Sequence, residues 1–421
     1  MEKKRIAGNG IPVYSFTNEN NHSFFISMFV KAGCMYESER ENGITHFLEH
    51  VAIRNVNSLM DYKLYRVLDR YGIEFNASTY SEMVQFYISG SDRHFRTAAE
   101  IIAKLLEPLQ LSREEIETER SRIKAEIREA GEKTTLAFTA AEEEWQGTPL
   151  SRLISGTLGS VSKITPRHLE SFRERIYNKE NLFFYVTGHV SPSDVDYLSS
   201  LVGRAVLTGT EIHTNKAELP ESFGHRQRRI KIKNADFTKI RYSFDVDMSR
   251  VTSAELDLLY DVVLRGYSSD FFIELSENRG LFYDLGGTVE RYTNVAIFTF
   301  YYEVKESKLY EAAQMTAELI KRYTECPVEE ERCMKAAYVD NAYILLDEPR
   351  DLAFTFAYDN HILGLGYSGI EDRRDTYASI TPERLREAAS IVFRPENMTV
   401  TLKANKKKID AERLEKIIFG E

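Results

Sequence analysis

The first part of the chain contains short apolar runs separated by polar residues. Residues 11–18 and 23–31 are rich in β-branched and aromatic residues, and the polar run NENN separates them. This pattern predicts a β-hairpin. From Gly43 to Gly72, apolar residues recur at helical spacing, with the glycine marking an end. We therefore expect two helices after the hairpin.

A second strand-like pattern follows, and then a long helical one. Residues 73–81 and 82–90 alternate apolar and polar side chains across a short break, which predicts a second hairpin. Further on, Ser112 is followed three residues later by Glu115, the spacing of a capping box. We expect a long helical segment from there towards Pro149.

One helix-turn-strand segment occurs twice. ITPRHLESFRERIYNKENLFFYVTG begins at Ile164, and ITPERLREAASIVFRPENMTVTLKA begins at Ile380. Aligning them pairs Thr165 with Thr381 and continues without gaps at a constant offset of 216 residues, since 380 − 164 = 216. A constant offset over a whole supersecondary unit indicates an internal duplication. We therefore predict two related halves.

The boundary between the halves is predicted from composition. Residues 207–229 show little apolar periodicity and carry glycine, proline and a cluster of charges, so we interpret them as a linker. The halves are then residues 1–206 and 230–421. The second half repeats the order of strands and helices, and we expect an α+β fold in which each half is a mainly antiparallel sheet backed by helices.

Composition narrows the class of protein. The 421 residues are 43% hydrophobic and 29% charged, which is typical of a globular chain, and the formal net charge of −10 argues against a nucleic-acid partner. The three cysteines are Cys34, Cys326 and Cys333, and they suggest neither a disulfide framework nor a thiolate zinc site. Neither a signal peptide nor a membrane span is expected, which makes a cytoplasmic location the simplest interpretation.

The strongest chemical signal is GITHFLEH. His46 and His50 are four residues apart on a predicted helix, so both imidazoles project from one face, and Glu49 lies on the same side. Two neutral imidazoles can bind zinc, and a nearby carboxylate can accept a proton from the water that zinc activates. A chance match on a polar helix face is the alternative, but the spacing favours a hydrolytic metal site.

A catalytic zinc site usually has a third protein ligand and one open position. Glu119 and Glu126 lie seven residues apart on the long acidic helix and therefore share a face. Taken alone, glutamates in such a charged run are more often part of a solvated surface. The residues by themselves leave both interpretations open.

Several segments together resemble the pitrilysin or insulinase-type zinc peptidases, the inverzincins. The HFLEH motif is followed, 76 residues after His50, by Glu126 within E-R-x-x-x-x-x-E. The likeness includes EFNASTYSEMVQFY (74–87), NRGLFYD (278–284) and the two ITP…N segments, so it spans nearly the whole chain. The resemblance implies one Zn²⁺ per chain, bound by His46, His50 and Glu126.

The same resemblance implies roles for neighbouring residues. Glu49 is the expected general base, and Glu119 is expected to orient a histidine ligand. Asn76, Ala77 and Thr79 are expected on an edge strand to which a peptide adds as an extra strand. The alternative for Asn76 is that it only ends a turn.

One position departs from the family pattern. Members that are complete in one chain resemble one another in an arginine followed seven residues later by a tyrosine, and both reach the substrate. Here Tyr283 matches the tyrosine, but Ser276 stands in place of the arginine and cannot supply its positive charge. Arg279 is nearer to Tyr283 and is expected to cap or pack. We therefore expect a second, related chain to supply an Arg/Tyr pair, and we favour this heterodimer over a homodimer.

Taken together, the sequence predicts a zinc-dependent endopeptidase that cuts short or unfolded peptides. Two alternatives belong to other classes of protein. One is a non-catalytic structural or peptide-presenting subunit of a peptidase-like complex, and the other is a carrier that binds peptides without cutting them. The complete set of His46, Glu49, His50 and Glu126 favours the enzyme.

Overall fold

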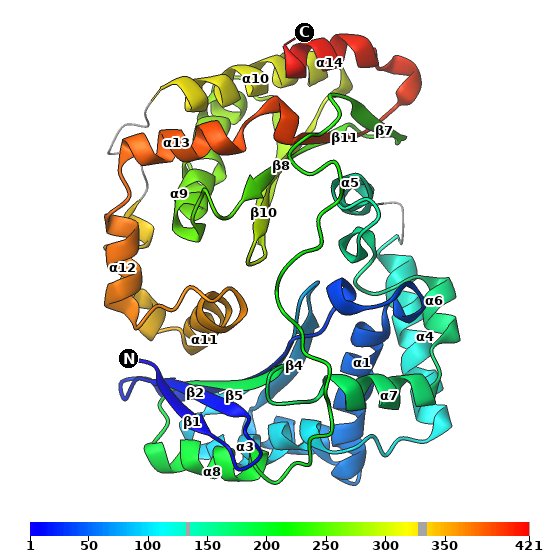
Figure 1. Ribbon diagram of the computed structural model, residues 1–421, viewed down its shortest axis with the longest axis vertical. Helices are drawn as coiled ribbons and strands as arrows, with labels where there is room; N and C mark the ends of the chain where they lie inside the picture. Colours follow the sequence, from blue (N-terminus) through cyan, green and yellow to red (C-terminus); the bar gives the residue numbers. More distant parts are fainter. Residues whose placement is uncertain (132–134, 327–334, 421) are drawn as a thin grey trace. The chain divides into compact units, whose positions relative to one another are not determined.

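The structure is a computed structural model that describes residues 1–131, 135–326 and 335–420. Two β-sheets and the helices packed on them make up the described chain (Figure 1). This architecture confirms the predicted α+β class. No helix among the described residues is both long and apolar enough to cross a membrane.

The first sheet has six strands in the order β1-β2-β6-β3-β5-β4, so β1 and β4 are its edges. The strands are Lys3–Ile6 (β1), Pro12–Thr17 (β2), Ser23–Val30 (β3), Glu74–Thr79 (β4), Val84–Ser91 (β5) and Leu182–Gly188 (β6). The predicted hairpin of β4 and β5 is confirmed by their antiparallel pairing. The predicted hairpin of β2 and β3 is wrong.

Strand β6 lies between β2 and β3 and separates them. It pairs in parallel with β2 and antiparallel with β3. Every residue of β6 is buried, as expected of a central strand with both faces covered. A continuous apolar strand needs a neighbour on each side, and the polar run between β2 and β3 is therefore a connection rather than a hairpin turn.

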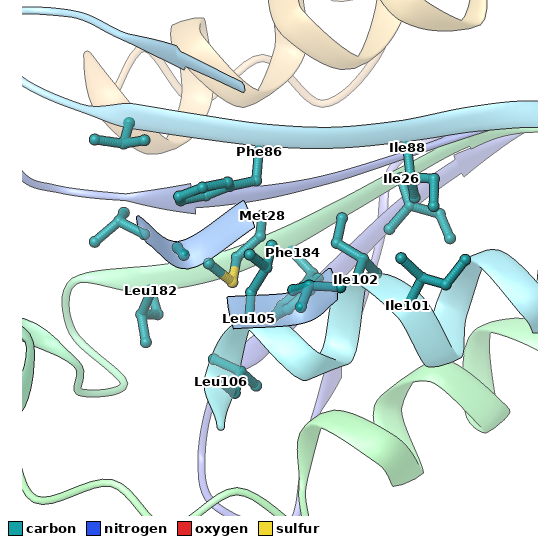
Figure 2. Packing of buried hydrophobic residues seen from close by; sticks show 14 of the residues in the cluster. Ile26, Met28, Phe86, Ile88, Ile101, Ile102, Leu105, Leu106, Leu182 and Phe184 are labelled. Atoms are coloured by element: carbon teal, nitrogen blue, oxygen red, sulfur yellow. The ribbon is translucent and has the colours of Figure 1, made fainter. Parts of the chain in front are cut away.

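Helices cover one face of this sheet with an apolar core. Figure 2 shows Ile26 and Met28 of β3 and Phe86 of β5 pointing at Ile102 and Leu105, which belong to α3 and the turn after it. Fully burying each such side chain stabilises the fold by roughly 1.5–3 kcal/mol. The helices of the first unit are Ile44–Leu59 (α1), Leu64–Tyr71 (α2), Phe95–Ala103 (α3), Arg113–Glu129 (α4), Leu158–Lys163 (α6), Pro166–Ile176 (α7), Pro192–Val202 (α8) and Pro349–Ala357 (α11).

The second sheet repeats the first. Its order is β7-β11-β8-β10-β9, which matches β2-β6-β3-β5-β4 strand for strand, including the parallel pairing of β7 with β11. This agreement confirms the two related halves. The elements are Ile230–Asn234 (β7), Lys239–Asp247 (β8), Phe282–Arg291 (β9), Val295–Val304 (β10), Met398–Ala404 (β11), Leu136–Glu144 (α5), Ser253–Leu264 (α9), Leu309–Glu325 (α10), Pro382–Val392 (α13) and Ala411–Phe419 (α14), with Ile370–Ala378 (α12) before α13.

The compact units do not coincide with the two halves of the sequence. The first unit includes Tyr343–Glu371, and with it α11, which packs on β3 and β6. The second unit includes α5, which packs on β8 and β11. Within the described residues, each half therefore contributes a helix to the other half's unit, α5 in one case and α11 in the other. The predicted boundaries of the two halves, residues 1–206 and 230–421, describe the sequence repeat and stay a prediction.

The helical segment after Ser112 is shorter than expected. Helix α4 ends at Glu129, and α5 begins at Leu136 as a separate helix, with Thr135 accepting a hydrogen bond from the Phe138 amide at its start. The prediction of one long helix towards Pro149 is therefore wrong. The break is what allows α4 to stay in the first unit while α5 belongs to the second.

The segment predicted to be a linker is ordered at both of its ends. In the first unit, the His213 amide donates to Asn181 Oδ1 at 2.9 Å, and the His213 ring stacks on Tyr36. In the second unit, Arg226 forms a buried ion pair with Asp245. Specific side-chain contacts thus hold each end of this segment to its own unit.

Candidate metal centre

The start of helix α1 is held by a buried carboxylate. Glu37, only 2% exposed, accepts hydrogen bonds from the backbone amides of Gly43 at 2.8 Å and Thr45 at 2.9 Å. These amides are among the first of the helix, which have no partner within it. Gly43 has φ = +90°, and a Cβ there would lie 2.7 Å from the Ser155 carbonyl oxygen. The local sequence therefore sets where α1 begins.

Helices α1 and α4 bring three ligand-type side chains together. One atom from each of His46, His50 and Glu126 lies within 4.8 Å of the others. Oε2 of Glu126 is 3.8 Å from Nε2 of His46 and 3.4 Å from Nε2 of His50. Ligands about 2.0–2.2 Å from a tetrahedral zinc ion lie roughly 3.3–3.6 Å apart. The two Glu126 distances are close to this range, and the histidine atoms, within 4.8 Å of each other, reach it when the two rings approach. The three residues therefore form a suitable ligand set for a zinc ion.

Burial prepares His46 for metal binding. It lowers the pKa of His46 to about 4, with the neighbouring His50 charge acting in the same direction. A neutral imidazole can offer its lone pair to a cation at neutral pH. For His50, burial also disfavours the charged form, but the carboxylates of Glu119, Glu49 and Glu126 outweigh this effect and raise its pKa.

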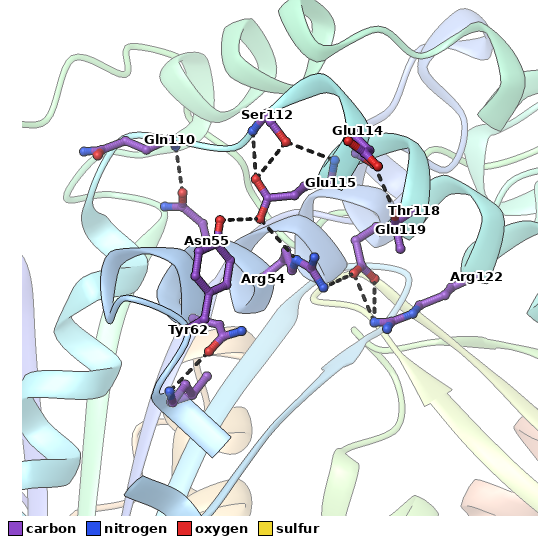
Figure 3. Close-up of polar contacts among 12 residues, drawn as sticks. Arg54, Asn55, Tyr62, Gln110, Ser112, Glu114, Glu115, Thr118, Glu119 and Arg122 are labelled. Atoms are coloured by element: carbon purple, nitrogen blue, oxygen red, sulfur yellow. Dashed lines mark hydrogen bonds and ion pairs between the residues drawn. The ribbon is translucent and has the colours of Figure 1, made fainter. Parts of the chain in front are cut away.

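Glu119 lies behind the histidine pair and is almost completely buried. Its side chain is 3% exposed, and Oε2 is 3.7 Å from Nδ1 of His50. Arg122 donates to both oxygens of Glu119, at 3.0 and 3.3 Å, and Arg54 approaches Oε1 at 3.8 Å (Figure 3). Burial favours the neutral acid, but these three cationic partners together lower the pKa of Glu119. The result is an ionised carboxylate beside a histidine ring.

A polar network joins α1 to α4 and to the loop that precedes α4. Arg54 Nε lies 3.5 Å from Glu115 Oε1, which also accepts from the Tyr62 hydroxyl at 3.1 Å (Figure 3). The Asn55 side chain accepts from the Gln110 amide at 2.7 Å. These contacts fix the spacing of the two helices that carry the ligands. The sequence offers no local signal for Arg54 or for Glu37, because their partners lie on other elements.

Glu49 has a different environment from the three ligand-type residues. Burial raises the pKa of its carboxyl group, while a hydrogen bond from Thr79 and the His50 charge oppose the rise. The Thr79 hydroxyl donates to Glu49 Oε2 at 2.5 Å. The carboxyl group thus lies close enough to His50 to feel its charge and is held by a residue of β4.

The edge strand β4 carries the predicted peptide-contacting residues. In the pairing with β5, Ala77 lies opposite Phe86 and Thr79 opposite Val84, so both face the α1 side of the sheet. Asn76 lies opposite Tyr87 on the other face, and its Oδ1 accepts from the Ala77 amide at 2.9 Å. The backbone edge of β4 that faces away from β5 pairs with no strand in the described chain.

The predicted residues of the second half are described only in part. Tyr283 belongs to β9, but its side chain lies outside the described residues. Ser276 lies in a short π-helical segment, Phe272–Glu277. Arg279 Nη1 is 3.8 Å from Glu311 Oε1, and the Arg279 side chain is half exposed. Arg279 therefore makes a surface ion pair, and the expectation that it caps or packs stays a prediction.

Comparison with known proteins gives the family. The model of insulinase, peptidase family M16, matches residues 13–158, and the model of the peptidase M16 inactive domain matches residues 163–337. The chain belongs to peptidase family M16. The candidate metal ligands His46 and His50 lie in the first match.

Relatives and solved structures agree with this assignment. An uncharacterized zinc protease of Rickettsia felis is 25% identical over 366 residues, which cover 86% of each chain. The β subunit of the mitochondrial-processing peptidase of Bos taurus is 27% identical over 199 residues, covering 46% of this chain and 39% of that protein. The crystal structure of a protease from Helicobacter pylori matches with a TM-score of 0.86 and 19% identity, over 96% of this chain and 99% of that one, and shows the shared fold.

Proposed function

We propose that this M16 chain is a zinc-dependent endopeptidase. The observation that carries the proposal is the convergence of one ring nitrogen each from His46 and His50 and a Glu126 carboxylate oxygen within 4.8 Å. Glu49 precedes His50 directly in the sequence. Two neutral donors and one carboxylate leave a zinc ion with net positive charge. Relatives named as zinc proteases support the same metal.

Each residue has a defined part in the proposed hydrolysis. Bound zinc supplies Lewis acidity, which acidifies water and polarises the scissile carbonyl group. Glu49 accepts the proton of the attacking water and delivers it to the leaving amide nitrogen. The buried surroundings that raise its pKa favour this second step, since a more basic carboxylate holds the proton until the C–N bond breaks. Glu119 keeps the His50 ring in place.

The proposed substrate is an extended peptide that adds to β4. The backbone edge of β4 next to Asn76 and Ala77 can hydrogen-bond to a further strand, and Glu49 contacts the end of β4 through Thr79. Backbone pairing places a peptide in register without reading its sequence. Short or unfolded peptides meet this requirement, because their backbone groups are free to pair.

We also propose that the chain works beside a second, related chain. Ser276 stands where complete family members resemble one another in an arginine, and Arg279 is engaged with Glu311. The relative from Bos taurus is named as a subunit, which supports an assembly of two chains. Turnover by the purified zinc-loaded chain alone, equal to that of a co-purified complex, would contradict the partner's role.

The test of the peptidase proposal is Glu49→Gln in the zinc-loaded full chain, co-purified with its proposed partner chain. We expect bound zinc to stay at one ion per chain and peptide turnover to fall by roughly 10²–10⁴-fold, because the base is lost while the ligands remain. Glu39→Gln, an exposed glutamate before α1, is the matched control. If the chain were a structural subunit or a peptide carrier, Glu49→Gln and Glu39→Gln would have the same effect on function. That result would overturn the proposal.

A further inference from the structure

The contact between Thr79 and Glu49 joins two elements with different roles. Thr79 is the last residue of β4, the edge strand, and Glu49 lies on α1. Their side chains meet at 2.5 Å although the residues are 30 positions apart in sequence. Among the hydrogen bonds of the described residues, this is the one that reaches the Glu49 carboxylate. It is a short, charge-assisted bond from a hydroxyl to a carboxylate.

The direction of the Thr79 side chain follows from strand register. Alternate residues of β4 face opposite sides of the sheet, and Thr79 shares the side of Phe75 and Ala77, which pack against the core containing α1. The hydroxyl therefore points towards α1 and not along the backbone edge where a further strand would pair. A β-branched side chain also has restricted χ1, so the hydroxyl is held in direction by its own backbone.

Glu49 needs such an anchor. Glutamate has three rotatable side-chain bonds, and a carboxylate that relays a proton has to be held close to both the water and the leaving nitrogen. The Thr79 bond occupies one oxygen, Oε2, and leaves Oε1 for other contacts.

We infer that Thr79 is a positioning residue for Glu49, so that the strand to which the peptide adds also aligns the general base. The inference rests on the proposed peptidase function and deepens it. Because the peptide is proposed to pair with the backbone of β4, substrate binding and alignment of the base act on the same strand. Thr79 therefore affects the chemical step through Glu49 and contributes little to peptide affinity.

The test compares Thr79→Val, which keeps the shape, with Thr79→Ser, which keeps the hydroxyl. The substrate is the tryptic peptide of casein that the zinc-loaded wild-type chain cuts fastest. We expect kcat of Thr79→Val to fall about 10–100-fold with KM changed less than about twofold, and Thr79→Ser to recover most of the loss. In the Glu49→Gln background, Thr79→Val is expected to cause no further loss of kcat and no change in the peptide Kd, because the two residues act as one unit.

Two further measurements separate positioning from structural damage. Zinc content and thermal stability of Thr79→Val should match those of Thr17→Val, an exposed threonine at the end of β2. In crystal structures, the Glu49 carboxyl group should move away from its wild-type position in Thr79→Val and return in Thr79→Ser. An unchanged Glu49 position, or a raised KM with unchanged kcat, would overturn the inference.

Failure of the proposed function gives a different result. If zinc-loaded wild-type chain cuts no peptide when it is co-purified with its partner chain, the peptidase proposal fails, and the Glu49 position in the crystal structures still decides whether Thr79 orients it. If wild type is active and Thr79→Val is equally active, only the positioning inference fails.

Discussion

The imidazole of His50 lies between two carboxylates of the same helix. Its Nε2 is 3.4 Å from Glu126 and its Nδ1 is 3.7 Å from Glu119, and the two glutamates lie two turns apart on α4. The longer distance is an ion-pair contact rather than a hydrogen bond. In zinc proteins, a carboxylate commonly orients the ligand histidine through the nitrogen that does not bind the metal. Glu119 is in the position to do so.

We predict that Glu119→Gln weakens zinc binding about 10–100-fold. The glutamine keeps the size of the side chain but removes its charge, so Arg122 loses this acidic partner and Arg54 keeps only Glu115, close to the candidate cation site. The measurement is the zinc dissociation constant, obtained by competition with a chelator at fixed pH. Glu129→Gln, an exposed glutamate on the same helix, is the control. Equal dissociation constants for the two variants would show that Glu119 does not support His50.

A second prediction concerns the start of α1, the helix that carries the candidate metal ligands His46 and His50. Glu37→Gln retains one acceptor oxygen, but it places an amide group where the carboxylate accepts from backbone N–H groups of Gly43 and Thr45. One buried donor then loses its partner, which costs about 1–3 kcal/mol. We expect the unfolding free energy of the zinc-free chain to fall by that amount.

The measurement is urea denaturation of the zinc-free chain, with Glu39→Gln as the control because Glu39 is exposed two residues away. We also expect weaker zinc binding in Glu37→Gln, since His46 lies in the first turn that Glu37 caps. If the two variants unfold at the same urea concentration, Glu37 does not hold the helix start.

Local spacing explains which part of the site was predictable. His46, Glu49 and His50 lie within one and a half turns of one helix, so the helical period alone places them together. Glu126 was assigned by resemblance, and the structure brings it to the two histidines. The Thr79–Glu49 contact and the Arg54 network depend on how separate elements pack, and no short sequence pattern encodes such contacts.

The same distinction holds for the fold. Most strands and helices of both halves were predictable from periodicity, although β1 and the break between α4 and α5 were not, and the duplication was predictable from a constant offset. The insertion of β6 between β2 and β3 was not predictable. A polar connection of a few residues is compatible with two strands that pair as a hairpin, and equally with two strands between which a later strand inserts. The exchange of α5 and α11 also depends on long-range packing, which outweighs sequence order.

Asp261 on α9 provides a last prediction, which concerns the second unit. Its side chain is 4% exposed and contacts Arg265 at 3.6 Å. Burial raises the pKa of Asp261 from 3.8 to about 6, although Arg265 and the Tyr338 hydroxyl oppose the rise. The folded chain therefore binds this proton more tightly than the unfolded chain does. The bound proton on Asp261 therefore adds roughly 2–3 kcal/mol to the unfolding free energy at low pH. This stabilisation is lost as the pH rises from about 4 to about 6.

Asp261→Asn removes this titration, so its unfolding free energy relative to wild type should rise by roughly 2–3 kcal/mol between pH 4 and pH 7. The single tryptophan, Trp145, is buried in the second unit, and its fluorescence during urea denaturation reports on that unit directly. Asp236→Asn, an exposed aspartate of the same unit, should keep a constant difference from wild type. A constant difference for Asp261→Asn as well would mean that burial does not hold the Asp261 proton.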